Sequence, residues 1–241
     1  MMIRMDARRK AQLDEFLARI QVSSFDQWHL LDAALTHSSY ANEHQCGHEY
    51  CNERLEFLGD AILDMVVGEY LFLHYPHMME GDLSKARASV VSEAPLADVC
   101  RDLNMGQYIL LGHGEIKSGG KFRHSILADA FEAVVGALYL GGSYDMARTF
   151  ILTQLQPYLQ RIQNGHYGRD YKTQFQEYVQ QDGEHNITYV LCAETGPDHN
   201  KTFTMQVCVD GSIRGVGSGK SKKEAEQCAA QAALQKVYVK E

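Results

Sequence analysis

The spacing of apolar residues changes once along the chain, and this change constrains the fold more than any other feature. Up to about residue 160, apolar residues recur three or four positions apart, as in Leu55, Leu58 and Ile62. This spacing places them on one face of a helix. Later, apolar and polar residues alternate over 188–193, 201–209 and 212–219, which predicts three strands. The sequence therefore predicts two domains of different structural class.

The predicted boundary between the domains lies near residue 165. Residues 161–169 contain two glycines and few apolar side chains, which is typical of a flexible linker. We therefore expect an all-α domain over 1–160 and a small α+β domain over 170–241. Short helices at 173–180 and 221–239 complete an α-β-β-β-α order in the second domain. With 45% hydrophobic residues in 241, the chain can bury two cores.

The compartment is constrained by what the sequence lacks. No stretch approaches the roughly 20 apolar residues that a membrane span needs. The N-terminus alternates charged and apolar residues and lacks the apolar segment of a secretory signal. The six cysteines are scattered and form no CxxC motif, which favours reduced thiols. We therefore expect a cytoplasmic protein with no membrane partner.

Four carboxylates follow one another at helical spacing in the first domain. They stand at i, i+3, i+7 and i+11 and therefore share one helix face: Glu53, Glu56, Asp60 and Asp64. Like charges this close repel one another by about 0.2–0.5 kcal/mol per pair on an exposed helix. A face this acidic therefore suggests either a solvated surface or a site that binds a cation.

A second acidic pair lies in an otherwise apolar helix. Asp129 and Glu132 are three residues apart and are surrounded by apolar neighbours, so their charges need a partner. If two helices cross, Glu56 and Asp60 could join this pair in an oxygen-only site. Mg²⁺ and Mn²⁺ prefer such ligands. Taken alone, each carboxylate is better explained as part of a solvated helix face, whereas the four together favour a metal site. The sequence does not show how the two helices pack.

The run CNERLEFLGDAILD at 51–64 closely resembles the signature of the ribonuclease III family. Three further stretches agree with this resemblance: 34–39 (ALTHSS), 80–87 (EGDLSKAR), and 117–120 (KSGG) followed by 125–129 (SILAD). The resemblance covers about residues 15–240. It implies a helical nuclease domain followed by a double-stranded-RNA-binding domain.

The resemblance also implies roles for individual acids. Glu56, Asp129 and Glu132 match the metal-binding carboxylates of the family, and Asp60 and Glu132 match its catalytic acids. Glu53 matches an accessory position, whereas no role transfers to Asp64. The implied cofactor is Mg²⁺, with Mn²⁺ as a substitute. The implied reaction is hydrolysis of phosphodiester bonds in double-stranded RNA to 5′-phosphate and 3′-hydroxyl ends. The implied enzyme is a homodimer that processes ribosomal precursor and messenger RNA.

The second domain contains a local basic cluster, although the net charge of the chain is −8. Lys220, Lys222 and Lys223 surround Ser221, a predicted N-cap, so cations and free N–H groups meet where a helix begins. This segment resembles the second helix of double-stranded-RNA-binding domains. By that resemblance the lysines bridge phosphates. Four other residues would contact minor grooves: Thr173, Gln176, Glu177 and His199.

Features of the sequence argue against three other interpretations. A protein that binds double-stranded RNA without cutting it would lack the acids that are present here. A helical hydrolase of small phosphates would lack the C-terminal RNA-binding pattern. A zinc site is conceivable in one short segment, at His44, Cys46, His48 and Cys51. Their spacing does not match a zinc finger, so we expect a polar loop there.

Overall fold

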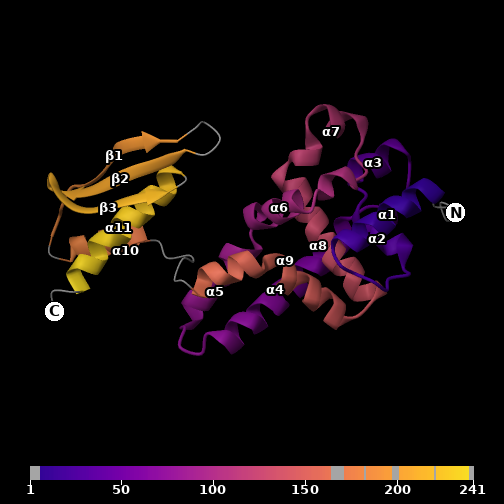
Figure 1. Ribbon diagram of the computed structural model, residues 1–241, viewed down its shortest axis with the longest axis horizontal. Helices are drawn as coiled ribbons and strands as arrows, with labels where there is room; N and C mark the ends of the chain where they lie inside the picture. Colours follow the sequence, from indigo (N-terminus) through magenta and orange to yellow (C-terminus); the bar gives the residue numbers. More distant parts are fainter. Residues whose placement is uncertain (1–5, 164–170, 182, 197–200, 220, 239–241) are drawn as a thin grey trace. The chain divides into compact units, whose positions relative to one another are not determined.

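The computed structural model describes residues 6–163, 171–181, 183–196, 201–219 and 221–238. The chain divides into two compact units, Met1–Gly168 and Arg169–Glu241. Over its described residues the first unit is helical apart from an isolated bridge between Thr36 and Leu110, and the second contains a three-stranded antiparallel sheet flanked by helices (Figure 1). The fold class predicted from the sequence is therefore confirmed.

The described helices of the first unit are joined by short turns. They are α1 (Ala7–Arg19), α2 (Trp28–Ala34), α3 (Ser38–Glu43), α4 (Glu53–His74), α5 (Glu80–Val91), α6 (Glu93–Asp102), α7 (His113–Lys117), α8 (His124–Gly141) and α9 (Tyr144–Gln163). Short 3₁₀ turns lie at His48–Tyr50, Met105–Gln107 and Gly120–Phe122. Helix α9 includes the first three residues of the predicted linker, and the rest of that linker lies outside the described residues. None of the helices described is both long and apolar enough to cross a bilayer.

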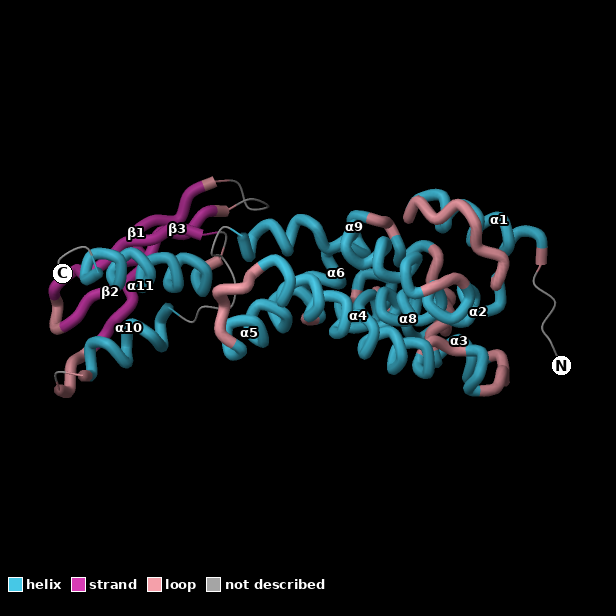
Figure 2. Tube along the Cα trace, turned by 90° about the horizontal axis from the view of Figure 1, so that it is seen from below, coloured by secondary structure: helices cyan, strands magenta, loops and turns pink. Residues whose placement is uncertain are grey.

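Helix α8 forms the centre of the first unit. It packs against α2, α4, α6 and α9, and these helices surround it in both views (Figure 2). Most of its residues are buried because the helix is apolar on nearly every side. Its only two acids, Asp129 and Glu132, are half-buried. These two carboxylates are therefore the exceptions in the core helix.

Helices α4 and α8 cross in direct backbone contact. A Cβ atom placed on Gly59 would lie 1.7 Å from the carbonyl oxygen of Glu132, and one placed on Gly136 would lie 2.4 Å from the carbonyl oxygen of Leu55. A glycine inside a helix destabilises it by about 0.5–1 kcal/mol relative to alanine. The two glycines are accommodated because they allow the helices to approach this closely.

The second unit is a small helix-on-sheet domain. Its elements are α10 (Tyr171–Gln180), β1 (Ile187–Thr195), β2 (Thr202–Val209), β3 (Ser212–Gly219) and α11 (Lys222–Tyr238), and the strands pair in the order β1-β2-β3. Both helices lie on the same face of the sheet (Figures 1 and 2). Gly215 and Gly217 face α11, where a Cβ would lie 2.2 Å from the backbone of Ala229. The core between the layers contains Phe175 and Val207.

Candidate active site

The crossing of α4 and α8 brings together acids that are far apart in the sequence. Glu56 and Asp60 lie on either side of Gly59, the residue that contacts the backbone of Glu132. Asp129 is one turn before Glu132 on α8. The crossing of α4 and α8 therefore brings together the four carboxylates that the sequence analysis predicts to share one site.

Glu132 carries the strongest electrostatic signature of this cluster. Burial, followed by the nearby charges of Asp60, Glu56, Asp129 and Asp64, raises the pKa of its carboxyl group to about 8. Within the described residues, no Lys or Arg forms an ion pair with Glu132. The carboxylate form of Glu132 therefore lacks a compensating positive charge.

The pKa of Glu56 and that of Asp129 are also raised. For Glu56 the causes are burial and then the charges of Asp129, Glu53 and Asp60. For Asp129 the main cause is burial, and Glu93 at the start of α6 adds to it. His37 acts in the opposite direction and lowers the pKa of Asp129. Like charges that raise one another's pKa lie close together.

The remaining two acids on this face of α4 lie at the margins of the cluster. Glu53 is exposed and interacts with Cys51 and with Glu56. Asp64 raises the pKa of Glu132 but pairs with Arg87 of α5 at 3.6 Å. Asp64 thus has its own cation, whereas no described Lys or Arg forms an ion pair with the acids at the crossing.

The sequence interpretation missed two neighbours of Asp129, which are His37 and Glu93. His37 precedes α3, and Glu93 opens α6, so both are distant from Asp129 along the chain. No spacing rule connects residues on three different elements. Gly59 is the sequence signal that could have indicated the helix crossing, because a glycine inside a helix suggests that another backbone approaches it.

The donor set at the crossing fits a hard divalent cation. All four side chains offer oxygen ligands, which Mg²⁺ and Mn²⁺ prefer. A bound cation would also supply the positive charge that the cluster lacks. Among the described residues, no three His, Cys, Asp or Glu side chains already have an arrangement that could hold an ion. The site would therefore need side-chain adjustment or waters to complete the coordination.

The His/Cys segment before α4 shows no metal-like arrangement among its described side chains. The His44 ring stacks on Tyr40, and its Nδ1 lies 3.0 Å from the Tyr40 carbonyl oxygen. The Cys51 thiol is buried, which raises its pKa. The side chain of His48 lies outside the described residues.

The pKa of Glu132 predicts how the stability of the metal-free chain depends on pH. Because the pKa rises from 4.5 to about 8 on folding, the folded state binds an extra proton between these values. The contribution of protonated Glu132 to the free energy of unfolding is complete below about pH 4.5 and is lost as the pH rises through 8. We expect the melting temperature in EDTA to fall between pH 6 and 9, and to fall less in Glu132→Gln. Equal slopes for the two proteins would contradict this assignment.

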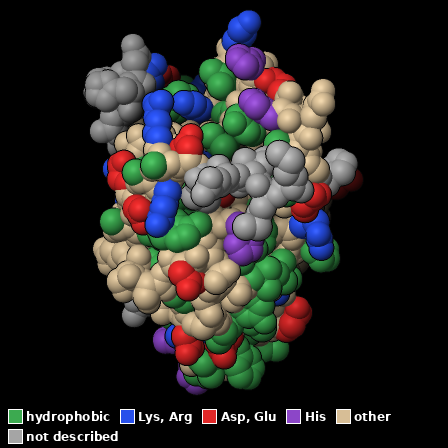
Figure 3. All heavy atoms as spheres, turned by 90° about the vertical axis from the view of Figure 1, so that its right-hand side faces the viewer, with side chains coloured by type: hydrophobic (Ala, Val, Ile, Leu, Met, Phe, Trp, Pro, Cys, Tyr) green, Lys and Arg blue, Asp and Glu red, His purple; other side chains and the backbone are tan. Residues whose placement is uncertain are grey.

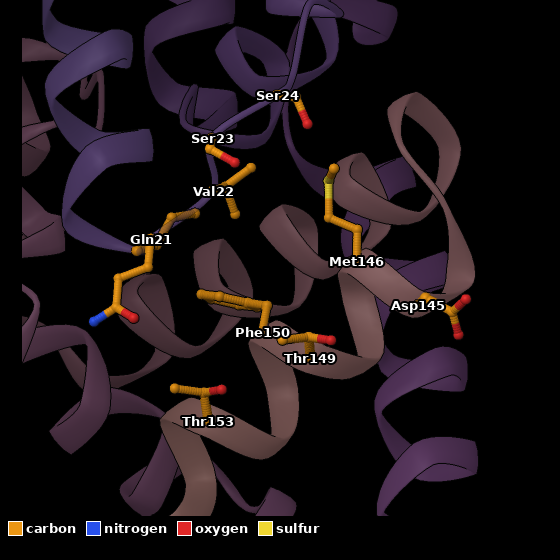
Figure 4. A pocket seen from close by; sticks show the side chains of 10 residues that line it. Gln21, Val22, Ser23, Ser24, Asp145, Met146, Thr149, Phe150 and Thr153 are labelled. Atoms are coloured by element: carbon orange, nitrogen blue, oxygen red, sulfur yellow. The ribbon is translucent and has the colours of Figure 1, made fainter.

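A separate hollow of about 320 Å³ lies between the α1–α2 connection and α9. Figure 4 shows Val22, Met146 and Phe150 around it, with Asp145 at its edge. Apolar side chains and hydroxyl groups dominate the lining, and no acid of the α4–α8 cluster belongs to it. This hollow therefore has no part in the chemistry proposed for the carboxylates.

In the second unit, the start of α10 lies beside the first turns of α11. Lys172 forms an ion pair with Glu226 at 2.7 Å, and its backbone N–H donates to Gln227 at 3.3 Å. Thr173, the next residue, is exposed, and so are Gln176 and Glu177 on the side of α10 away from the core. This contact brings the exposed face of α10 near the basic start of α11.

The start of α11 is capped as the sequence predicts. Ser221 Oγ accepts the backbone N–H of Glu224 at 3.1 Å. Lys222 and Lys223 are exposed and form no ion pair with a described residue. The other two predicted RNA contacts, His199 and Lys220, lie outside the described residues.

Basic residues do not form one continuous surface on the face of the first unit seen in Figure 3. Lys and Arg side chains there lie among Asp, Glu and hydrophobic ones. Charge on this face is therefore mixed, in keeping with the net charge of −8. An anionic polymer would therefore contact Lys and Arg side chains in local clusters rather than over the whole surface.

Comparison with known proteins gives consistent results for both units. Residues 27–159 match the family described as Ribonuclease-III-like, and residues 171–237 match the double-stranded RNA binding motif. The chain is 47% identical to Ribonuclease 3 of Desulforamulus reducens over 92% of each chain. It is 44% identical to Ribonuclease 3 of Bacillus licheniformis over 97% of this chain and 93% of that protein.

A solved structure resembles the first unit. It is the nuclease domain of ribonuclease III from Campylobacter jejuni, with 42% identity and a TM-score of 0.56. The match covers 61% of this chain and 97% of the solved one. In that domain, a region involved in dimer formation is structurally flexible.

Proposed function

The chain belongs to the ribonuclease III family of double-strand-specific endoribonucleases, and on this basis we propose that it hydrolyses double-stranded RNA with Mg²⁺ as cofactor. The observation that carries the proposal is the carboxylate cluster at the crossing of α4 and α8. Its acids raise one another's pKa and lack a paired cation among the described residues. A divalent ion would relieve that repulsion.

In this proposal Glu56, Asp129 and Glu132 hold the metal, and Asp60 and Glu132 are the catalytic acids. Bound Mg²⁺ would polarise a phosphate oxygen and lower the pKa of a water. Asp60 is exposed and lies beside Glu132, so it can orient a water at the phosphate and accept its proton. Glu53 is an accessory acid that interacts with Glu56.

The second unit would hold the substrate. Thr173, Gln176 and Glu177 are exposed on α10 and would contact the minor groove, while Lys222 and Lys223 would meet phosphates at the start of α11. His199 and Lys220 would add contacts from positions outside the described residues. Such domains read the shape of the duplex over about 16 base pairs.

Family membership also supports finer proposals about the products and the setting. We infer that cleavage leaves 5′-phosphate and 3′-hydroxyl ends, and that ribosomal precursor and messenger RNA are substrates. We also place the enzyme in the cytoplasm. Mn²⁺ is expected to replace Mg²⁺, because both ions accept carboxylate and water ligands.

The proposed activity is tested by incubating the full chain with long double-stranded RNA in Mg²⁺ or in EDTA. We expect duplex fragments in Mg²⁺, and intact RNA that is bound in a gel-shift assay in EDTA. Binding without cleavage in Mg²⁺ or Mn²⁺ would instead identify a binding protein. Cleavage of single-stranded RNA at the same rate would contradict double-strand specificity.

We further propose that the enzyme is a homodimer. Helix α4 presents an exposed apolar stripe beside the acidic face, which includes Phe57 (81% exposed), Met65 (52%) and Phe72 (70%). Exposed apolar stripes of this kind are typical of interfaces. The dimer-forming region named for the Campylobacter jejuni domain supports the same assembly.

Replacing Phe57 by Gln is expected to dissociate this dimer. A central aromatic side chain in an interface contributes about 2 kcal/mol or more, which is about a 30-fold change in affinity. Mass determination by light scattering should therefore show monomer at concentrations where the wild type is dimeric. Phe122, 75% exposed in a 3₁₀ turn, is a matched control, and Phe122→Gln should remain dimeric. A dimeric Phe57→Gln protein would contradict this interface.

A further inference from the structure

Positive charge is concentrated in a short segment that ends α7 and leads into α8. Residues 117–123 (KSGGKFR) include three cations and no acid, although the net charge of the chain is −8. Lys117 and Lys121 are exposed, and neither forms an ion pair with a described residue. The segment follows α7, at the top of the first unit in Figure 1. Its charge is therefore available to an anionic partner.

An exposed aromatic ring lies among these cations. Phe122 is 75% exposed and stands between Lys121 and Arg123 in the chain. A single exposed apolar side chain is normal on a protein surface and by itself indicates nothing. A ring beside unpaired cations is different, because it combines a surface for base stacking with charge that attracts phosphates. This combination is typical of proteins that bind single-stranded nucleic acid.

The backbone that carries the ring is held by its neighbours. Arg123 pairs with Glu115 at 2.8 Å and donates to Ser118 Oγ at 2.9 Å. A Cβ atom placed on Gly106 would lie 2.2 Å from the carbonyl oxygen of Lys121, so the two backbones are in close contact. The segment is therefore ordered before it meets a ligand, which lowers the entropic cost of binding.

The segment leads directly into the helix that bears proposed metal ligands. Arg123 is the residue before α8, and Asp129 follows six residues later on that helix. The rise of an α-helix places these two positions about 9 Å apart along its axis. An RNA strand that reaches the carboxylates therefore passes close to the basic segment.

The exposed ring favours unpaired nucleotides over paired ones. Bases inside an A-form duplex are stacked on one another, and side chains stack on bases only where the strand is single. The lysines can contact the phosphates of either form, whereas Phe122 gains a stacking partner only from an unpaired base. Stacking of this kind tolerates any sequence, because every base has a flat face.

We propose that residues 117–123 bind the unpaired strand that flanks a duplex substrate, with a base stacked on Phe122 and phosphates at Lys117 and Lys121. This inference rests on the proposed action on double-stranded RNA. It adds to that function a preference for duplexes with a single-stranded extension. Loss of one base–aromatic contact lowers affinity about fivefold or more.

Four variants separate stacking from charge. Phe122→Ala removes the ring, and Phe122→Trp retains one. The double variant Lys117→Gln, Lys121→Gln removes charge and keeps the ring. Ile116→Ala is the matched control, because Ile116 is a neighbouring apolar residue, 50% exposed, that has no ring. All four side chains are exposed, so we expect every variant to melt near the wild-type temperature.

The test measures RNA binding by each full-length variant through fluorescence anisotropy in EDTA, so that the RNA stays intact. The two probes are a blunt-ended RNA duplex and the same duplex with an unpaired oligouridine extension. We expect the wild type to bind the extended duplex about fivefold more tightly, or better. Phe122→Ala should lose this preference and keep its affinity for the blunt duplex, whereas Phe122→Trp and Ile116→Ala should keep the preference.

The double lysine variant tests the phosphate contacts separately. Each phosphate contact with a single strand contributes about 0.7 to the slope of log affinity against log salt concentration. We therefore expect the slope for the extended duplex to decrease by about 1.4 when both contacts are lost. An unchanged slope would contradict the role of the two lysines.

Equal affinity of the wild type for the two duplexes would overturn the proposal, and so would a preference that persists in Phe122→Ala. A preference that is lost in Ile116→Ala, or that follows melting temperature across the variants, would overturn it as well, because either result indicates a structural effect. Failure of the wild type to bind the blunt duplex, or to cleave it in Mg²⁺, would instead contradict the proposed function. The blunt duplex thus distinguishes the two failures.

Discussion

Glu132→Gln is expected to abolish cleavage of double-stranded RNA while leaving RNA binding intact. The substitution keeps the size of the side chain and removes the charge that interacts with Asp60, Glu56 and Asp129. Loss of one group that stabilises transition-state charge lowers kcat by about 10²–10³-fold. Because Glu132 is also a proposed metal ligand, we expect the decrease in kcat to lie at the upper end of that range. Cleavage in saturating Mg²⁺ and a gel-shift assay on the same RNA measure the two properties.

Asp64→Asn provides the matched control for this substitution. Asp64 lies on the same helix face and also raises the pKa of Glu132, but it pairs with Arg87. We therefore expect Asp64→Asn to retain most of the activity. Loss of RNA binding in parallel with cleavage in Glu132→Gln would contradict the separation between a metal site on the first unit and RNA contacts on the second.

The same substitution should increase the stability of the metal-free protein. At neutral pH and above, the wild type must either protonate Glu132 or hold an unpaired carboxylate among other acids. Glutamine removes this conflict. A variant that is more stable but inactive would indicate that the acidic cluster is maintained for its chemistry at the expense of stability.

The sequence predicted the elements and the two fold classes because hydrophobic periodicity reports directly on them. Of the residues at helical spacing, Leu55 and Ile62 are buried in α4, and Leu58 is partly buried against the same core. The alternating segments correspond to β1, β2 and β3 with shifts of one or two residues at their ends. Periodicity depends only on near neighbours, so it can be read without a structure.

The sequence could not predict how the helices cross, because crossing depends on contacts between distant residues. Spacing favours a shared site for Glu56, Asp60, Asp129 and Glu132 but does not show that their helices meet, and the backbone contact at Gly59 shows that α4 and α8 cross there. His37 and Glu93 were missed because each lies on a different element from Asp129. Neighbours of this kind become visible only when the packing is known.

Gly59→Ala is expected to disrupt both the fold of the first unit and its site. The new Cβ would lie 1.7 Å from the Glu132 carbonyl oxygen and 3.1 Å from the Gly136 backbone nitrogen, so α4 and α8 must move apart. Such overpacking destabilises a core by about 1–3 kcal/mol, occasionally more. A displacement of about 1 Å between catalytic groups can lower activity about 100-fold. We therefore expect a lower melting temperature and a large loss of cleavage activity in Mg²⁺.

Gly68→Ala on the same helix separates this effect from helix propensity. A Cβ at Gly68 would meet only Arg87 Cδ, at an ordinary 3.9 Å. Alanine should therefore leave stability unchanged or raise it by about 0.5–1 kcal/mol, with activity preserved. Wild-type melting and cleavage in Gly59→Ala would mean that the backbone contact does not assemble the carboxylates. A loss of activity with an unchanged melting temperature would indicate that only Glu132 is displaced. Its carbonyl oxygen is the atom nearest to the new methyl group.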